Sequence, residues 1–181
     1  MSNIAKIKKF SIENGKGIRT SIFFSGCEHY CKNCFNSELW DFNVGRLFER
    51  DIYENEIKPT INEHIAGISI LGGEPMHPKN VETVCHFVWN FKEDFPNKTI
   101  WLWSGYTLEE LLSEEYKEQL DDVCKFNEVV KHILENIDVL VDGRYIDEQR
   151  DLRLKWRGSS NQRVINMPET IKQKKIVLFD K

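Results

Sequence analysis

The amino-acid sequence predicts an α/β fold with a mostly parallel sheet, and two observations carry that prediction. Short apolar runs alternate along the chain with longer, charged stretches of helical character. Glycine or polar residues directly follow the main apolar runs, as expected where buried strands end. Strands that alternate with helices favour right-handed βαβ units. Because these units are too few for a full eight-fold barrel, we predict a partial, open βα barrel.

The predicted core strands are the four strongest apolar runs. They cover residues 19–25, 65–71, 98–103 and 137–141. Two shorter β-like pieces follow at residues 164–166 and 175–179. In a parallel sheet the carboxyl ends of the strands meet at one edge, so the loops that follow these runs are expected to converge.

The predicted helices occupy the stretches between the strands. They cover residues 48–64, 80–94, 108–120 and 123–134. Residues 80–94 have the clearest pattern, because their apolar residues follow the i, i+3, i+4 spacing of one helix face. Pro59 is expected to break or restart the first of these helices.

Length and composition indicate a globular chain. The 181 residues are 40% hydrophobic and 30% charged, which excludes a disordered protein. We expect a single domain over residues 1–181, with a core from about residue 10 to 165 and a C-terminal extension over 166–181. The sequence has neither an apolar stretch of about 20 residues nor a secretory signal, so no membrane partner is expected. A net charge of −4 without a Lys/Arg block also argues against nucleic acid as a partner.

Three of the five cysteines fall within eight residues, directly after the first predicted strand. Cys27, Cys31 and Cys34 have the spacing C-x3-C-x2-C. Five cysteines, an odd number with three close together, do not favour a framework of disulfide bonds. Such a cluster is typical of a loop that binds a metal or takes part in redox chemistry in a reducing compartment. The expected location is therefore the cytoplasm.

Three thiolates in one loop favour an iron–sulfur cluster. A structural zinc site needs four protein ligands, and an ordinary cubane iron–sulfur cluster is likewise bound by four cysteines. With three, one iron keeps a free position for a substrate or cofactor. A Cys3His zinc site that uses His29 or another histidine remains the alternative on this motif alone.

Glycine-rich and polar segments follow the later strands. Gly72, Gly73 and Glu74 follow the second core strand, and the glycines allow a ligand to approach the backbone closely. The glutamate offers an anionic acceptor for an ammonium group. Ser104 and Asp142 end the two later strands. Taken alone, the Gly-Gly-Glu-Pro turn at residues 72–75 is more often a tight loop than a binding site.

Together these motifs resemble the radical S-adenosylmethionine (SAM) enzymes. The closer resemblance is to the glycyl-radical-enzyme activases, and within them to the family that activates anaerobic ribonucleoside-triphosphate reductase. It is carried by residues 14–20, 24–27, 101–106, 139–144 and 156–163. The chain departs from that family's usual pattern at Lys16, where proline is common, and at Glu74, where aspartate is frequent. The second departure keeps the carboxylate.

The resemblance implies a set of ligands. Cys27, Cys31 and Cys34 would bind a [4Fe-4S] cluster, whose open iron would bind the amino and carboxylate groups of SAM. The residues expected to contact SAM are Asn33, Cys34, Phe35, Gly72, Gly73, Glu74, Ser104 and Asp142. No catalytic residue beyond these ligands is implied.

The resemblance also implies a reaction. An electron from a donor such as flavodoxin or ferredoxin would cleave SAM to methionine and a 5′-deoxyadenosyl radical. That radical would remove hydrogen from a glycine of the reductase and leave a glycyl radical. One alternative is an activase of another glycyl-radical enzyme such as pyruvate formate-lyase, against which residues 157–162 speak. The other is a non-catalytic iron–sulfur or zinc protein, which leaves residues 72–75 unexplained.

Two further groups of residues lack an assigned role. The lone cysteines Cys85 and Cys124 lie on helical stretches and are expected in the core. Five arginines follow the last core strand, at Arg144, Arg150, Arg153, Arg157 and Arg163. They are either plain surface, a docking edge for the reductase or, for Arg144, part of the SAM pocket.

Overall fold

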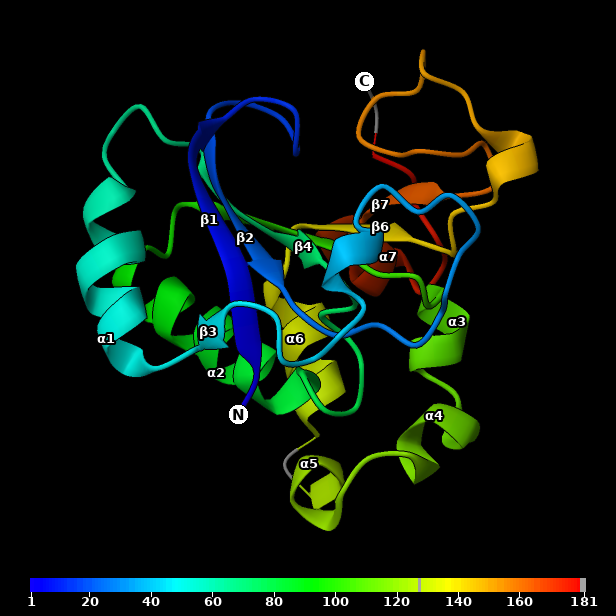
Figure 1. Ribbon diagram of the computed structural model, residues 1–181, viewed down its shortest axis with the longest axis horizontal. Helices are drawn as coiled ribbons and strands as arrows, with labels where there is room; N and C mark the ends of the chain where they lie inside the picture. Colours follow the sequence, from blue (N-terminus) through cyan, green and yellow to red (C-terminus); the bar gives the residue numbers. More distant parts are fainter. Residues whose placement is uncertain (127, 180–181) are drawn as a thin grey trace.

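The computed structural model describes residues 1–126 and 128–179 and contains one seven-stranded sheet. The strands are β1 (Asn3–Ser11), β2 (Arg19–Phe24), β3 (Arg46–Leu47), β4 (Gly67–Gly72), β5 (Thr99–Trp103), β6 (Val139–Asp142) and β7 (Arg163–Asn166). Their order is β3-β1-β2-β4-β5-β6-β7. The strands β2, β4, β5 and β6 are parallel, whereas β1, β3 and β7 pair antiparallel at the two sides (Figure 1).

The predicted α/β class and mostly parallel sheet are confirmed, and the sheet does not close. The four predicted core strands correspond to β2, β4, β5 and β6. Parallel strands are covered on both faces, and this explains why they were readable as continuous apolar runs. Within β4, for example, Ile68 and Ile70 are fully buried.

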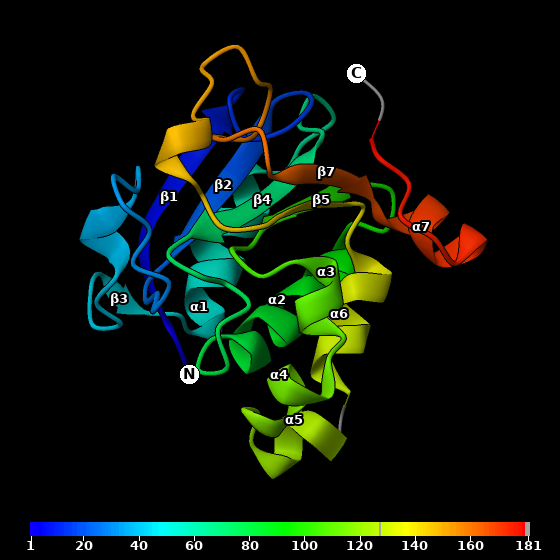
Figure 2. The ribbon, with the colours of Figure 1, turned by 90° about the vertical axis from the view of Figure 1, so that its right-hand side faces the viewer.

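Helices cover one face of the sheet, as Figure 2 shows for α1, α2, α3 and α6. The α-helices are α1 (Arg50–Ile52), α2 (Val81–Asp94), α3 (Leu108–Leu111), α4 (Glu114–Glu118), α5 (Asp122–Phe126), α6 (Val129–Asn136) and α7 (Met167–Gln173). Three 3-10 turns cover Ser37–Leu39, Lys58–Thr60 and Asp147–Gln149, and a π-helical segment covers Tyr53–Ile57.

Three predicted helices are interrupted in the structure. The stretch 48–64 forms the short α1, the π-helical segment and a 3-10 turn that contains Pro59, so the proline restarts a helix of a different type. The stretch 108–120 forms α3 and α4, because the Ser113 side chain accepts a hydrogen bond from the Tyr116 N–H and begins a new helix. The stretch 123–134 falls on α5 and α6, and residue 127 between them lies outside the described residues.

Several elements were not predicted. They are β1, β3, α7 and the short 3-10 turns. The β-like piece expected at 175–179 pairs with β7 only locally, where the Asn166 N–H donates to the carbonyl of Val177 at 2.8 Å. It continues the sheet as an isolated bridge between Ile165 and Leu178.

The two faces of the sheet belong to two apolar clusters. Along β5, Ile100 and Leu102 pack into the large cluster with the helices. The alternate residue Trp101 packs on the opposite face, together with Trp156 and Phe179. Because side chains alternate along a strand, one strand supplies both layers. The segment that follows β6 thus covers the face of the sheet that the helices leave open.

None of the helices within residues 1–126 and 128–179 has the length and apolar character needed to cross a lipid bilayer.

Candidate functional site

The cysteine loop begins where β2 ends, and its backbone is held on both sides. Gly26 has a φ of +93°, and a Cβ there would lie 2.0 Å from the ring of Phe42, so only glycine fits. The Cys27 N–H donates to the carbonyl of Trp40 at 3.0 Å. Tyr30 and Asn33 adopt left-handed backbone angles, with φ of 48° and 56°, and turn the loop back on itself.

The loop after β4 is hydrogen-bonded to the cysteine loop. The Glu74 N–H donates to the carbonyl of Gly26 at 2.8 Å. The Asn80 side chain donates to the carbonyls of Ser25 and Glu74 at 3.0 and 2.9 Å. A Cβ on Gly73 would lie 2.6 Å from the Gly26 oxygen, so the glycine permits this close approach. The two loops therefore form one rigid unit at the carboxyl ends of neighbouring parallel strands.

A cavity of about 130 Å³ lies between these strand ends. Seven of the predicted site residues line it: Cys27, Cys31, Cys34, Gly72, Gly73, Glu74 and Ser104. The other lining residues are His29, Asn36, Leu71, Trp103, Gly105, Gly143, Tyr145 and Gln162. The loops that follow β2, β4, β5 and β6 thus converge, as the strand-end argument required (Figure 1).

Three predicted SAM contacts lie outside this lining. The amide of Asn33 donates to Asp147 at 2.7 Å. Phe35 is about half exposed, packs edge-on against Tyr145 and lines a neighbouring cavity of about 420 Å³. Asp142 is fully buried, and its carboxylate is paired with the Arg163 guanidinium.

The neighbouring cavity adjoins the cysteine loop. The two cavities share the lining residues Cys34, Asn36, Leu71, Trp103, Tyr145 and Gln162. The polar and aromatic wall is therefore continuous from one cavity to the other. A ligand too large for the smaller cavity can extend along this wall into the larger one.

The electrostatics of Cys27 and Cys31 do not suit a nucleophile. Burial raises the pKa of Cys27 to about 12 and also raises the pKa of Cys31. A nucleophilic cysteine needs a lowered pKa, which neither of these thiols has. A bound metal supplies the positive charge that deprotonates its thiol ligands. Three thiols on one cavity wall fit the donor set of an iron–sulfur cluster.

The zinc alternative needs His29 or another histidine as the fourth ligand, and both ring nitrogens of His29 have protein partners. Nε2 lies 3.1 Å from Glu74 Oε2, and Nδ1 accepts from Arg144 Nε at 3.2 Å. In the part of the chain that the structure describes, no three His, Cys, Asp or Glu side chains lie close enough to hold a single metal ion. A zinc ligand needs a free ring nitrogen, so His29 does not complete a Cys3His site in this arrangement.

Sequence reasoning missed several lining residues. Gly105 and Gly143 follow β5 and β6, so the strand-end rule was a signal for them. Tyr145 and Gln162 come from the long segment after β6, where neither periodicity nor spacing shows which side chains turn inward. Asn36, whose amide donates to the carbonyl of Gly72 at 3.1 Å, gave no sequence signal.

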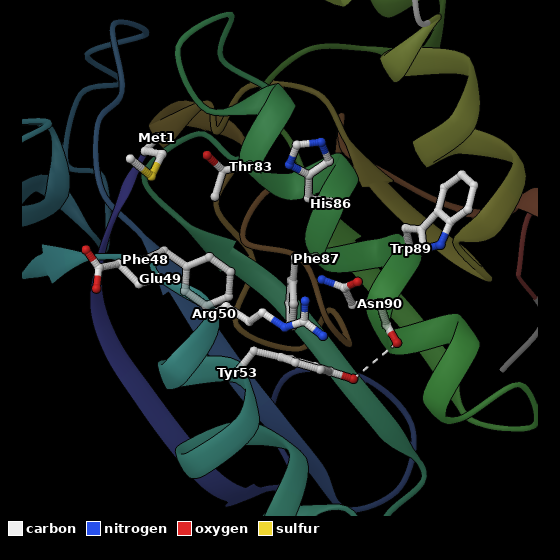
Figure 3. Close-up of a pocket in the computed structure, with 10 residues that line it drawn as sticks. All are labelled: Met1, Phe48, Glu49, Arg50, Tyr53, Thr83, His86, Phe87, Trp89 and Asn90. Carbon is white, nitrogen blue, oxygen red and sulfur yellow. Dashed lines mark hydrogen bonds between the residues drawn. The ribbon is translucent and has the colours of Figure 1, made fainter.

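A larger cavity lies elsewhere. It measures about 560 Å³ and lies where the N-terminus meets α1 and α2 (Figure 3). Phe48, Tyr53 and Phe87 contribute to its wall, and Tyr53 Oη donates to the carbonyl of Asn90 at 3.2 Å. None of the described residues that line it is a cysteine. The chemistry of the side chains therefore points to the smaller cavity at the strand ends.

Comparison with known proteins points to the same part of the chain as the cavity does. Residues 13–165 match the model of a protein family described as "4Fe-4S single cluster domain". This match contains the three cysteines and every strand from β2 to β6.

Curated relatives match nearly their whole length. A protein of Haemophilus influenzae is 42% identical over 153 residues, which are 82% of this chain and 88% of the relative. A protein of Escherichia coli K12 is 37% identical over 153 residues, covering 83% and 90%. A protein of Enterobacteria phage T4 is 32% identical over 162 residues, covering 90% and 92%. Each of these relatives carries the name anaerobic ribonucleoside-triphosphate reductase-activating protein.

Proposed function

The chain belongs to the family of anaerobic ribonucleoside-triphosphate reductase-activating proteins, and we propose that it activates such a reductase by generating its glycyl radical. The proposed cofactors are one [4Fe-4S] cluster on three cysteines and SAM. In this proposal the chain is a radical SAM oxidoreductase, and its open sheet is a partial barrel of the radical SAM type.

One observation carries the proposal above all others. Three thiols lie in one cavity with the Gly72–Gly73 backbone and the Glu74 carboxylate. Cys27, Cys31 and Cys34 would hold three irons, which leaves the fourth iron open toward the cavity. The amino group of an amino acid that binds that iron still carries N–H donors, which need an acceptor beside it, and Glu74 offers one.

The protein's own residues position the cofactors. The cluster held by these residues, when reduced, would supply the electron for cleavage of SAM to methionine and a 5′-deoxyadenosyl radical. Glu74 would orient the amino group, and Ser104 holds the Glu74 carboxylate through its hydroxyl at 2.8 Å. Phe35 would contact SAM from the neighbouring cavity, whose wall continues that of the cluster cavity. Asn33 and Asp142 are proposed at the edge of the same pocket.

The reductase is the proposed macromolecular partner. Its radical-bearing glycine would have to approach the cavity, because hydrogen abstraction requires contact between the reacting atoms. A flavodoxin or ferredoxin is the proposed electron donor, and the cytoplasm is the proposed location. We propose that the whole chain acts as one domain in this role.

Anaerobic reconstitution with iron and sulfide tests the chemistry. The loaded protein, given dithionite and SAM, is expected to form 5′-deoxyadenosine, measured by chromatography. With the reductase also present, a glycyl-radical signal is expected by electron paramagnetic resonance. A fully loaded cluster that yields no 5′-deoxyadenosine would refute the radical SAM assignment. A glycyl signal on pyruvate formate-lyase in place of the reductase would assign a different partner.

A further inference from the structure

The carboxylate of Glu74 already accepts four hydrogen bonds within the protein. Oε1 accepts from Ser104 Oγ at 2.8 Å and from the Met76 N–H at 2.9 Å. Oε2 accepts from the Gly105 N–H at 2.6 Å and faces His29 Nε2 at 3.1 Å. A carboxylate has about four acceptor sites, and the Glu74 side chain is only 1% exposed. An incoming amino group therefore donates to Glu74 only if one of these donors leaves.

His29 is the donor that can leave. The donors of Met76 and Gly105 are backbone N–H groups in the loops after β4 and β5. Ser104 is buried, and its hydroxyl also accepts from the Tyr106 N–H at 3.0 Å. His29 makes the longest of the four contacts, through a side chain that lines the cavity.

The contacts of His29 indicate which ring nitrogen carries the proton and how the ring lies in this structure. Arg144 Nε can only donate, so Nδ1 accepts and the ring donates to Glu74 through Nε2. The ring packs edge-on against Tyr106, with centroids 4.5 Å apart. A Cβ on Gly105 would lie 2.3 Å from the ring, so the glycine provides the space that His29 fills.

Arg144, the partner on the far side of the ring, lies at the protein surface. About half of its side chain is exposed, and its guanidinium also lies 3.7 Å from Glu110. Release of His29 therefore breaks its buried contact with Glu74, whereas its other polar contact is to a half-exposed side chain.

We propose that, in the SAM-free protein, His29 occupies the position on Glu74 that the amino group of SAM takes, so that SAM binding and the release of His29 are one exchange. The inference rests on the proposed function, because it requires SAM as the ligand of this cavity. His29 acts through Glu74 and is a positioning residue. It satisfies a buried carboxylate that would otherwise lack one donor, and the exchange replaces the histidine N–H by an N–H of the SAM amino group.

Matched variants test the exchange through binding alone. The binding of SAM to the reconstituted protein is measured anaerobically by equilibrium dialysis, without reductant, so that no cleavage occurs. His29→Leu keeps the packing against Tyr106 and removes the donor, and His29→Gln keeps a donor. His29→Leu is expected to bind SAM about fivefold more tightly, because one competing hydrogen bond is gone. His29→Gln is expected to stay within about twofold of the parent protein.

Two controls separate the exchange from a general disturbance. His77→Gln changes another histidine–carboxylate contact beside the loop, at 3.3 Å from Glu28 and outside the cavity lining, and is expected to leave SAM binding unchanged. 5′-Methylthioadenosine lacks the amino acid part of SAM, so its binding is expected to be equal in the parent protein and His29→Leu.

The possible failures are distinguishable. If the loaded parent protein does not bind SAM, the proposed function itself fails. If the parent binds SAM but His29→Leu, with full iron content, binds it equally or more weakly, only the exchange is overturned. Equal tightening in His29→Leu and His29→Gln, or a parallel change for 5′-methylthioadenosine, would also overturn it.

Discussion

Replacement of Cys31 by alanine is expected to abolish both the iron–sulfur cluster and the formation of 5′-deoxyadenosine. Three thiols line the cavity, and a cluster held by three ligands has none to spare. Among the other polar lining residues, Asn36 and Gln162 carry amides, which are poor ligands for the soft irons of a cluster. We expect iron and sulfide content to fall more than about tenfold after reconstitution, measured by chemical analysis and by the cluster's visible absorption.

Cys85→Ala is the matched control for that experiment. Cys85 is buried on α2 within the large apolar cluster, and burial raises its pKa to about 11. Its removal is expected to leave the cluster content unchanged. A Cys31→Ala protein that keeps its cluster would contradict the ligand assignment, and so would a folded Cys85→Ala protein that loses it.

The sequence was most informative for the strands that are buried on both faces. The runs at 65–71 and 98–103 match β4 and β5 closely, because the central parallel strands need apolar residues on each side. β1 was missed since Ile4 and Ile7 lie three residues apart, which is not the two-residue alternation of a regular strand. The pairing of β1 with β2 is irregular there, with a register shift between Ile4 and Lys6. α7 did have a start signal, because Asn166 caps the helix and Pro168 lies in its first turn.

The candidate site was predictable in its position and less so in its details. The strand-end rule brought Cys27, Gly72 and Ser104 to one cavity without any knowledge of side-chain contacts. It could not place Asn33 and Phe35, because the left-handed backbone angle at Asn33 redirects the side chains around it. Directions inside an irregular loop depend on such angles, which residue spacing does not encode.

The alternation of side chains along β6 explains where Asp142 lies. Val139 and Val141 belong to the apolar cluster that includes Trp101, whereas Leu140 belongs to the large cluster on the helix side. Asp142 is two residues beyond Leu140 and shares its face. Its carboxylate therefore meets the start of α3, where the Leu108 N–H donates to Oδ2 at 2.8 Å.

Arg163→Leu is accordingly expected to destabilise the protein strongly. Arg163 donates to both oxygens of Asp142, at 2.9 Å from Nε and 2.5 Å from Nη2, and Asp142 is fully buried. Hydrogen bonds to Glu109 and Asp142 raise the pKa of Arg163 above its ordinary value. Removing one partner of a buried ion pair leaves an uncompensated charge and costs about 3–5 kcal/mol. The free energy of unfolding is measured by urea titration with circular dichroism as the signal.

The variants around this pair also decide what Asp142 does. Glu109→Gln removes the exposed partner of the same arginine and is expected to cost less than about 1 kcal/mol. Asp142→Asn combined with Arg163→Leu is expected to recover part of the stability lost in Arg163→Leu, because no buried charge is then left unpaired. If Asp142 contacts SAM as its position at a strand end first suggested, Asp142→Asn will weaken SAM binding while the protein keeps its stability. If the role of Asp142 is to join β6, β7 and the start of α3, Asp142→Asn will lower the free energy of unfolding. Any loss of SAM binding will then be proportional to the loss of folded protein.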